Sequence, residues 1–218
     1  MNFDPFGWAE KWIPARWLHA IIRVFILTVL CAFLTLHIRR YDHYLLKPLW
    51  IAEGLIYAVF LLIYSVRTDP KDRSRGFAEI VLPLIGAVLP FALLLSPPAR
   101  WIAPFPFRQQ AIFYWMALAS CLTVWGLWTL RRSFSITVEV RSLVLGGPYR
   151  WIRHPIYLGE VLTAGAVATW RFSWVNVCIW IVFVLVQMVR ARLEEGKLCA
   201  FYPEYGSRMK GKWFWEKT

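Results

Sequence analysis

The stretch IYLGEVLTAGAVATWRFSWVNVCIWIVFVLVQMVR, residues 156–190, contains two apolar runs with a short polar interruption. The runs cover 156–170 and 173–190, and Arg171 and Ser173 lie at the interruption, beside Trp170 and Trp174. Together the runs are too long for one helix across a bilayer, because about 20 apolar residues span the hydrocarbon core. We therefore predict a tight helical hairpin, which need not cross the membrane completely.

Four further apolar segments precede this hairpin, at 17–37, 49–66, 78–96 and 111–130. Each is close to the length needed to cross ~30 Å of hydrocarbon. Hydrophobic residues make up 59% of the chain, whereas soluble domains contain roughly half or less. Many of the 14 tryptophans lie where apolar and polar stretches meet, which is typical of aromatic belts at membrane interfaces. The sequence thus predicts an all-α, polytopic membrane helical bundle with five to six transmembrane segments.

The basic residues are distributed unequally between the two sides of this predicted bundle. One side holds the stretches before 17, 67–77, 131–155 and after 189, with 18 Lys and Arg residues. The other side holds 38–48, 97–110 and the turn at Arg171, with six. Because cytoplasmic loops carry the excess of Lys and Arg, we predict a multi-pass integral membrane protein whose N- and C-termini are cytoplasmic.

The composition argues against a nucleic-acid-binding site and against a metal site. The net charge of +12 is explained by loops that face anionic lipid, and no recognisable nucleic-acid-binding module accompanies it. We therefore expect the lipid bilayer, and no nucleic acid, as a partner. The four cysteines have neither disulfide-framework nor zinc-motif spacing, so no metal site is expected. The sequence indicates no oligomeric state.

Some polar residues and prolines fall inside the predicted spans. Arg23, Glu53 and Glu79 are candidates for function, because charge within a membrane is costly. Each also lies within about two turns of a predicted helix end, where a long side chain reaches the interface. Pro83 and Pro90 are expected to kink the third span.

The hairpin connects two polar stretches that both lie on the predicted cytoplasmic side. RRSFSITVEVRSLVLGGPYRWIRHPIYLGE, residues 131–160, leads into it, and QMVRARLEEGKLCAFYPEYG, residues 187–206, leads out of it. Since a hairpin returns the chain to its starting side, we predict one site built from both stretches.

The first polar stretch has the composition of a loop that bends around a ligand. Gly146 and Gly147 permit unusual backbone conformations, and Pro155 suits the first turn of a helix. His154 offers both a donor and an acceptor near neutral pH, and Tyr157 offers a ring for stacking. An interfacial loop that only anchors the helix is the alternative.

The second polar stretch places four side chains on one helix face. Gln187, Arg190, Glu194 and Leu198 recur at intervals of three and four residues. Arg190 and Glu194 are expected to pair where the helix leaves the membrane. The alternative is a solvated helix end whose long side chains reach the interface.

GPYRWIRHPIYLGE (147–160), followed about forty residues later by RARLEEGKL, resembles the isoprenylcysteine carboxyl methyltransferase family. That family is part of a wider group of integral-membrane methyltransferases that includes phospholipid methyltransferases. The shared elements are RHPxYxG, a helical hairpin and RxxxEE, and LWTLRRSFSI (127–136) is also similar to the family. The resemblance covers 120–206. It implies N-terminal transmembrane helices in 1–110 and a methyltransferase core in 111–218.

The resemblance implies S-adenosylmethionine as the methyl donor, bound in a cytoplasmic pocket. Arg190 would face the substrate, and Glu194 would hold the cofactor. The catalytic residues implied are therefore Arg190 and Glu194, with Glu194 or His154 as the base if the acceptor is an amine or hydroxyl. Glu139 fits a polar cofactor position only with a gap in the alignment. The implied cofactor-binding residues are Arg141, Ser142, Leu143, Val144, Tyr149, His154, Pro155, Ile156, Tyr157 and Glu194.

Other functions stay open at this point. Membrane sterol and steroid reductases, which bind NADPH, are similar in their last helices, but they tend to have Asn where this chain has Ile156. A non-enzymatic membrane scaffold is the third possibility. For the methyltransferase, the acceptor is expected to be lipidic or prenylated, most like the carboxylate of a prenylcysteine. The run LCAFYPEYG (198–206) departs from the family pattern.

Overall fold

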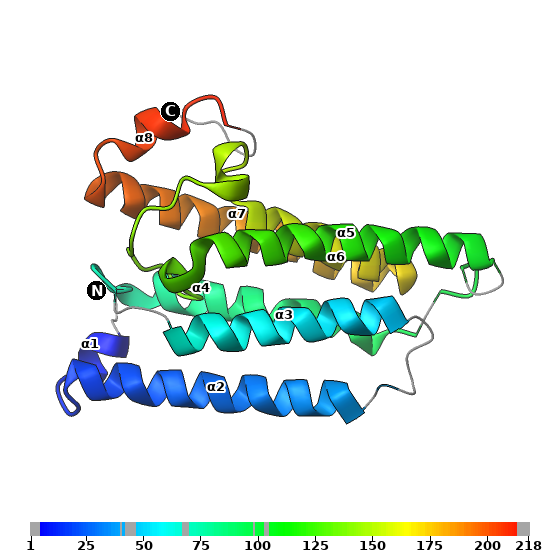
Figure 1. The fold of residues 1–218 in the computed structure, drawn as a ribbon, viewed down its shortest axis with the longest axis horizontal. Coiled ribbons are helices and arrows are strands. Elements are labelled where there is room, and N and C mark those ends of the chain that lie inside the picture. The colour runs from blue at the N-terminus through cyan, green and yellow to red at the C-terminus, as the bar shows by residue number, and fades with distance from the viewer. Residues whose placement is uncertain are drawn as a thin grey trace.

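A computed structural model describes residues 5–39, 41, 47–66, 70–97, 99–102 and 105–212. Within them the regular elements are helices, and β pairing is limited to isolated bridges, such as the one between Asp72 and Val140. The predicted all-α class is thus confirmed for the described residues (Figure 1). The elements are α1 (Pro5–Ala9), α2 (Ala15–Arg39), α3 (Lys47–Val66), α4 (Gly76–Val88), η2 (Leu89–Leu95), α5 (Pro106–Leu130), η3 (Arg131–Ser133), η4 (Gly147–Arg150), α6 (Pro155–Trp170), α7 (Trp174–Phe201) and α8 (Tyr205–Met209).

Four helical segments of the described chain are long and apolar enough to cross a membrane: Ala20–Arg39, Gly76–Leu95, Pro106–Ser133 and Trp174–Phe201. A shorter apolar helix covers Gly54–Val66. These segments fit a multi-pass membrane protein. A total of five to six spans remains a prediction, because α6 has 16 residues and so is shorter than a typical span.

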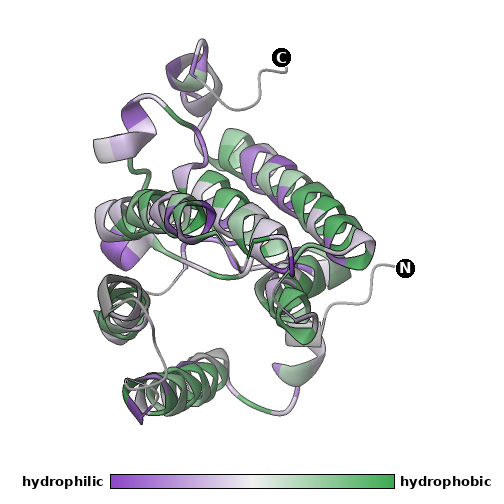
Figure 2. Cartoon of the chain, turned by 90° about the vertical axis from the view of Figure 1, so that its right-hand side faces the viewer, coloured by the Kyte–Doolittle hydropathy of each residue, from purple (hydrophilic) through white to green (hydrophobic). Residues whose placement is uncertain are grey.

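The helices are arranged in layers. α5, α6 and α7 lie together, α3 and α4 pack beneath them, and α2 contacts α3 at the edge of the bundle (Figure 1). Viewed along the helices, the ribbons are predominantly hydrophobic (Figure 2). Many large apolar side chains are exposed, among them Phe25 at 67% and Leu118 at 73%. Apolar surface on this scale suits contact with lipid.

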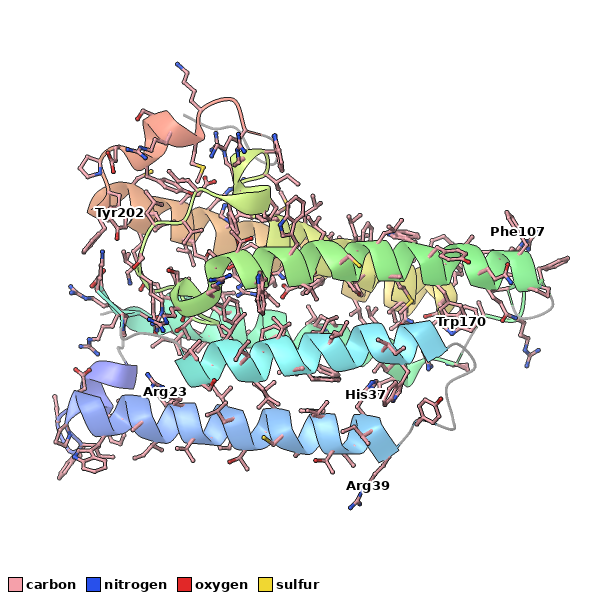
Figure 3. All side chains as sticks on the ribbon, in the orientation of Figure 1. Arg23, His37, Arg39, Phe107, Trp170 and Tyr202 are labelled. Atoms are coloured by element: carbon pink, nitrogen blue, oxygen red, sulfur yellow. The ribbon has the colours of Figure 1, made fainter. Side chains whose placement is uncertain are left out.

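Residues predicted on opposite sides of the membrane lie at opposite ends of the molecule. Tyr202 is at one end, and Arg39, Phe107 and Trp170 are at the other (Figure 3). We name the end with Tyr202 the site end and the other the far end. The site end brings together segments predicted to be cytoplasmic, since the amide of Lys71 donates to the carbonyl of Val140 at 2.8 Å.

One lysine connects the C-terminal helix to the N-terminal half at the site end. Lys197 Nζ in α7 donates to Glu79 Oε2 in α4 at 2.5 Å and to the carbonyl of Arg73 at 2.6 Å. It also donates to the carbonyl of Val138 at 3.3 Å. Glu79, a candidate functional residue from the sequence, therefore takes part in an ion pair between helices.

At the far end, polar side chains satisfy the carbonyls of η2. Pro90 lies at the start of this 3-10 segment, where the α-helical hydrogen-bond pattern of α4 ends. Arg171 donates to the carbonyls of Leu94 and Ser96, and Asn176 Nδ2 donates to the carbonyl of Leu93 at 3.2 Å. The change to 3-10 geometry agrees with the irregularity expected at Pro90, whereas Pro83 lies inside α4.

The close approach of α5 and α6 depends on glycine. A Cβ on Gly159 would come within 2.9 Å of the carbonyl oxygen of Ala119, and one on Gly126 would overlap the Ile156 side chain. α6 is joined to α7 by residues 171–173 and packs against it. These contacts fix the start of α6 beside the end of α7. Of the other charged candidates, Arg23 is half-buried in α2, and the side chain of Glu53 lies outside the described residues.

Candidate functional site

A pocket lies at the site end, where the segment 130–157 meets the end of α7 and α8. It holds about 760 Å³ of empty space, including the solvent-open part at its mouth. Both polar stretches identified in the sequence contribute to its walls. The lining residues are Leu130, Ser133, Phe134, Ser135, Thr137, Glu139, Ser142, Leu143, Val144, Tyr149, Arg153, His154, Ile156, Tyr157, Glu194, Leu198, Tyr205 and Met209.

Most of the residues predicted for the site lie in this one pocket. The three that are not among its lining residues are Arg141, Pro155 and Arg190. Pro155 is the buried first residue of α6, where its missing amide hydrogen costs no helical hydrogen bond. The functional roles of all these residues remain predictions. The predicted residues that line the pocket are Ser142, Leu143, Val144, Tyr149, His154, Ile156, Tyr157 and Glu194.

The glycine-rich turn before η4 is held in a conformation that requires glycine. Gly147 has a φ of +54°, and a Cβ there would lie 2.5 Å from Thr129 Oγ1 of α5. η4 follows and buries the Tyr149 side chain. Burial raises the pKa of the Tyr149 phenol well above its ordinary value, and the Glu194 carboxylate raises it further. Tyr149 is therefore a protonated hydrogen-bond donor at the pocket wall.

A buried ion pair shapes the wall before η4. Arg141 Nη2 lies 2.6 Å from Glu139 Oε2, and their side chains are 1% and 4% exposed. The hydroxyls of Ser135 and Thr137 also donate to this carboxylate, at 2.9 and 3.0 Å. Glu139 lines the pocket with several of its acceptor positions already used. Arg141 thus lies behind the wall and holds Glu139 in place.

Glu194 and Tyr157 connect the two motifs directly. The Tyr157 hydroxyl donates a hydrogen bond to Glu194 Oε1 across the pocket wall. The ring of Tyr157 covers the guanidinium of Arg190, whose carbon lies 4.6 Å from the ring centre. Arg190 is therefore behind Tyr157 rather than at the pocket surface.

The polar contacts continue from Arg190 into the bundle. Arg190 Nη1 donates to Gln187 Oε1 at 2.8 Å, and Nη2 donates to the carbonyl of Ile136 at 3.1 Å. The amide nitrogen of Gln187 donates to Glu160. The shared helix face of Gln187, Arg190 and Glu194 is thus a continuous polar strip that is held from both sides.

His154 has a partner that sequence reasoning did not assign. Its Nε2 lies 3.0 Å from Glu195 Oε1, and Arg153 Nη1 lies 3.6 Å from the same oxygen. The His154 ring stacks on the Tyr157 ring, with centroids 5.5 Å apart and an interplanar angle of 7°. A carboxylate on one ring nitrogen and a stacked neighbour fix the orientation of the imidazole.

Some of the remaining lining residues could be predicted from sequence similarity, and others could not. The segment LWTLRRSFSI contains Leu130, Ser133, Phe134 and Ser135, and its similarity to the methyltransferases was the available signal. α8 contributes Tyr205 and Met209. Tyr205 echoes the family's C-terminal run, although LCAFYPEYG as a whole departs from it, and no sequence signal pointed to Met209.

Comparison with known proteins bears on the same part of the chain. Residues 110–204 match the family model described as phospholipid methyltransferase. The curated "Uncharacterized protein YpbQ" of Bacillus subtilis (strain 168) is 31% identical over 121 residues, which cover 54% of this chain. The matched region spans 66% of that protein's length. Residues 110–204 are therefore similar to phospholipid methyltransferases, which confirms the resemblance to integral-membrane methyltransferases predicted from the two motifs.

Proposed function

We propose that this protein transfers a methyl group from S-adenosylmethionine to a lipidic or amphipathic acceptor at the membrane. One observation carries the proposal: side chains from both methyltransferase-like motifs line a single pocket within the segment that matches the family. Loop residues 142–157 and Glu194 are separated along the chain by most of α6 and α7. Packing of these helices around a shared ligand site accounts for their convergence.

The side chains at the pocket fit the chemical groups of this cofactor, which carries a methyl sulfonium, an ammonium, a carboxylate and an adenine. Glu194 offers a carboxylate for a cation or a ribose hydroxyl. Arg153 and His154 offer donors for an anion. Leu143 and Val144 offer apolar surface for a flat aromatic ring.

When bound, the cofactor would supply an electrophilic methyl group for in-line attack by the acceptor, with S-adenosylhomocysteine as the leaving group. The chain's contribution is to align the reactants and exclude water. Tyr157 holds the Glu194 carboxylate in one orientation, and Arg190 supports the Tyr157 ring from behind. For an amine or hydroxyl acceptor, Glu194 is positioned to take the proton. A carboxylate acceptor needs no base.

The apolar wall of the pocket supports a lipidic acceptor. Phe134, Ile156 and Tyr157 line the pocket and also belong to a buried cluster with Ile63 and Leu127 of the bundle. An amphipathic molecule could therefore place its polar group beside Glu194 and its apolar part along this wall. A prenylcysteine carboxylate is the first acceptor to test, and a phospholipid amine is the second.

Calorimetric titration of the detergent-purified protein tests the cofactor directly. We expect S-adenosylhomocysteine to bind and NADPH not to bind. NADPH binding alone would assign the protein to the reductases, and binding of neither would favour a scaffold. The acceptor is then sought by transfer of a labelled methyl group to the two acceptor classes in lipid vesicles.

A further inference from the structure

The C-terminal segment beyond the family match is part of the pocket. The match ends at residue 204, and α8 begins at Tyr205. Tyr205 and Met209 line the pocket and are 3% and 2% exposed. Figure 1 shows α8 beside the loop that contains η4, above the end of α7. The walls of the site thus extend past the two motifs.

Lys212 fixes the end of this segment to the loop. Its Nζ donates to the carbonyl of Tyr149 at 2.8 Å, and Tyr149 is itself a lining residue. The ammonium is therefore held next to the pocket. Lys210, two residues earlier, is exposed and makes no contact of this kind with the described residues.

Arg153 supplies a second cation at the same place. It lines the pocket and is 8% exposed. Its Nε is buried and, among the described residues, has no hydrogen-bond partner. A buried donor without a partner costs free energy, and more so on a charged group. An arginine that lines the pocket and keeps an unpartnered donor suits an anionic ligand.

Among the described residues, Arg153 has one carboxylate partner, and Lys212 has none. Burial and the nearby charge of Arg153 both lower the pKa of Lys212, so the two cations are close enough to repel. Glu195 is the carboxylate near Arg153, and its Oε1 is shared with His154 at 3.0 Å. Because that carboxylate is shared, Arg153 and Lys212 together retain the capacity to bind a second anion.

We propose that Arg153 and Lys212 form a carboxylate subsite of the pocket, which receives the α-carboxylate of the cofactor's amino-acid portion. The assignment rests on the proposed function and extends it to a residue outside the family segment. It gives the C-terminal segment a direct part in recognising the cofactor.

Two ligands that differ only in the carboxylate test this assignment. We would titrate the parent protein and Lys212→Met with S-adenosylhomocysteine and with its decarboxylated analogue. A charge-assisted contact at a half-buried position is worth about a tenfold change in affinity. We expect Lys212→Met to bind S-adenosylhomocysteine about tenfold more weakly than the parent, and to bind the decarboxylated analogue as the parent does.

Matched variants separate this effect from general changes. Lys210→Met removes the same charge from an exposed position two residues away and should leave both affinities unchanged. Lys212→Arg should restore most of the discrimination between the ligands. Equal weakening of both ligands in Lys212→Met, or no weakening of either, would overturn the subsite. A parent protein that binds neither ligand would instead overturn the proposed function.

Discussion

At the scale of single residues, Glu194 is the side chain on which the two motifs converge. It accepts the hydrogen bond of Tyr157 from the first motif and is itself part of the second. It is half-buried and lines the pocket. A carboxylate placed in this way has acceptor capacity left for a ligand, because an ionised carboxylate accepts several hydrogen bonds.

The charge of Glu194 should therefore matter for cofactor binding. Glu194→Gln keeps the size of the side chain and an acceptor for Tyr157, but it removes the negative charge. Hydrogen bonds to charged groups contribute about 1.5–3 kcal/mol, so we expect S-adenosylhomocysteine to bind about 10- to 100-fold more weakly. Calorimetry measures the change. Glu204→Gln is the control, since Glu204 is exposed and pairs with Arg208 at the surface. If Glu194→Gln binds S-adenosylhomocysteine as tightly as the parent protein does, Glu194 does not bind the cofactor.

At the scale of elements, the packing of α5 against α6 positions the pocket. Gly159 lies one turn into α6, soon after the lining residues Ile156 and Tyr157. Because the first turn of α6 carries these side chains, separating the helices would displace one pocket wall. Close packing leaves no free volume in which such a change could be absorbed.

A methyl group at Gly159 tests this dependence. Its Cβ would meet Thr123 and would lie 2.9 Å from the carbonyl oxygen of Ala119, and overpacking of this kind costs about 1–3 kcal/mol. We expect Gly159→Ala to lower the thermal denaturation midpoint in detergent and to weaken S-adenosylhomocysteine binding. Gly196→Ala is the matched control, because a Cβ there meets no atom within 4 Å, and alanine favours a helix by about 0.5–1 kcal/mol. A midpoint for Gly159→Ala at or above that of the parent would contradict the packing argument.

At the scale of the whole molecule, the N-terminal half supports the pocket formed by the C-terminal half. The segment that pairs with 138–140 comes from the connection between α3 and α4, as the contact of Ser74 Oγ with the carbonyl of Val138 at 2.9 Å shows. Lys197 joins the same connection to α7. The pocket wall is thus held by residues outside the family match.

The pair of Lys197 and Glu79 should stabilise the folded molecule, with the effect of each charge coupled to the presence of the other. Breaking a fully buried ion pair costs about 3–5 kcal/mol. The side chains of Lys197 and Glu79 are 10% and 23% exposed, so we expect Lys197→Met to lower the free energy of unfolding by a smaller amount, about 2 kcal/mol. That loss lowers the denaturation midpoint by about 4–8 °C in a chain of this size. Adding Glu79→Met should recover part of it, since an apolar pair leaves no unpaired charge. Arg208→Met, at an exposed ion pair, is the control; a double variant no more stable than Lys197→Met would contradict the coupling.

The orientation of the molecule in the membrane gives a further prediction at this scale. The site end carries the excess of Lys and Arg, so we expect it to face the cytoplasm. In a variant without native cysteines, Lys210→Cys and Arg100→Cys place one exposed thiol at each end with the same loss of charge. An impermeant maleimide added to intact cells should label position 100, and should label position 210 only after permeabilisation. The reverse pattern would invert the orientation.

The helices and most of the pocket lining follow from the amino-acid sequence alone. Apolar runs predict the first residue of each helix from α2 to α7 within five residues, because backbone groups in lipid must be satisfied within the helix. The end of α7 was predicted wrongly: the helix continues to Phe201, eleven residues past the apolar run that ends at 190. The short polar interruption at Arg171 brings the two motifs to one end. Eight of the predicted site residues line the pocket for that reason.

Tertiary structure alone decided which side chains meet. Arg190 lies behind Tyr157, Glu195 pairs with His154, and Lys212 reaches the η4 loop. Each contact joins segments more than thirty residues apart, and it depends on how each helix is rotated about its axis and how closely its neighbour approaches. Those quantities are set by packing across the whole bundle, so local sequence patterns determine which helices form, and only the packed bundle determines the polar contacts between them.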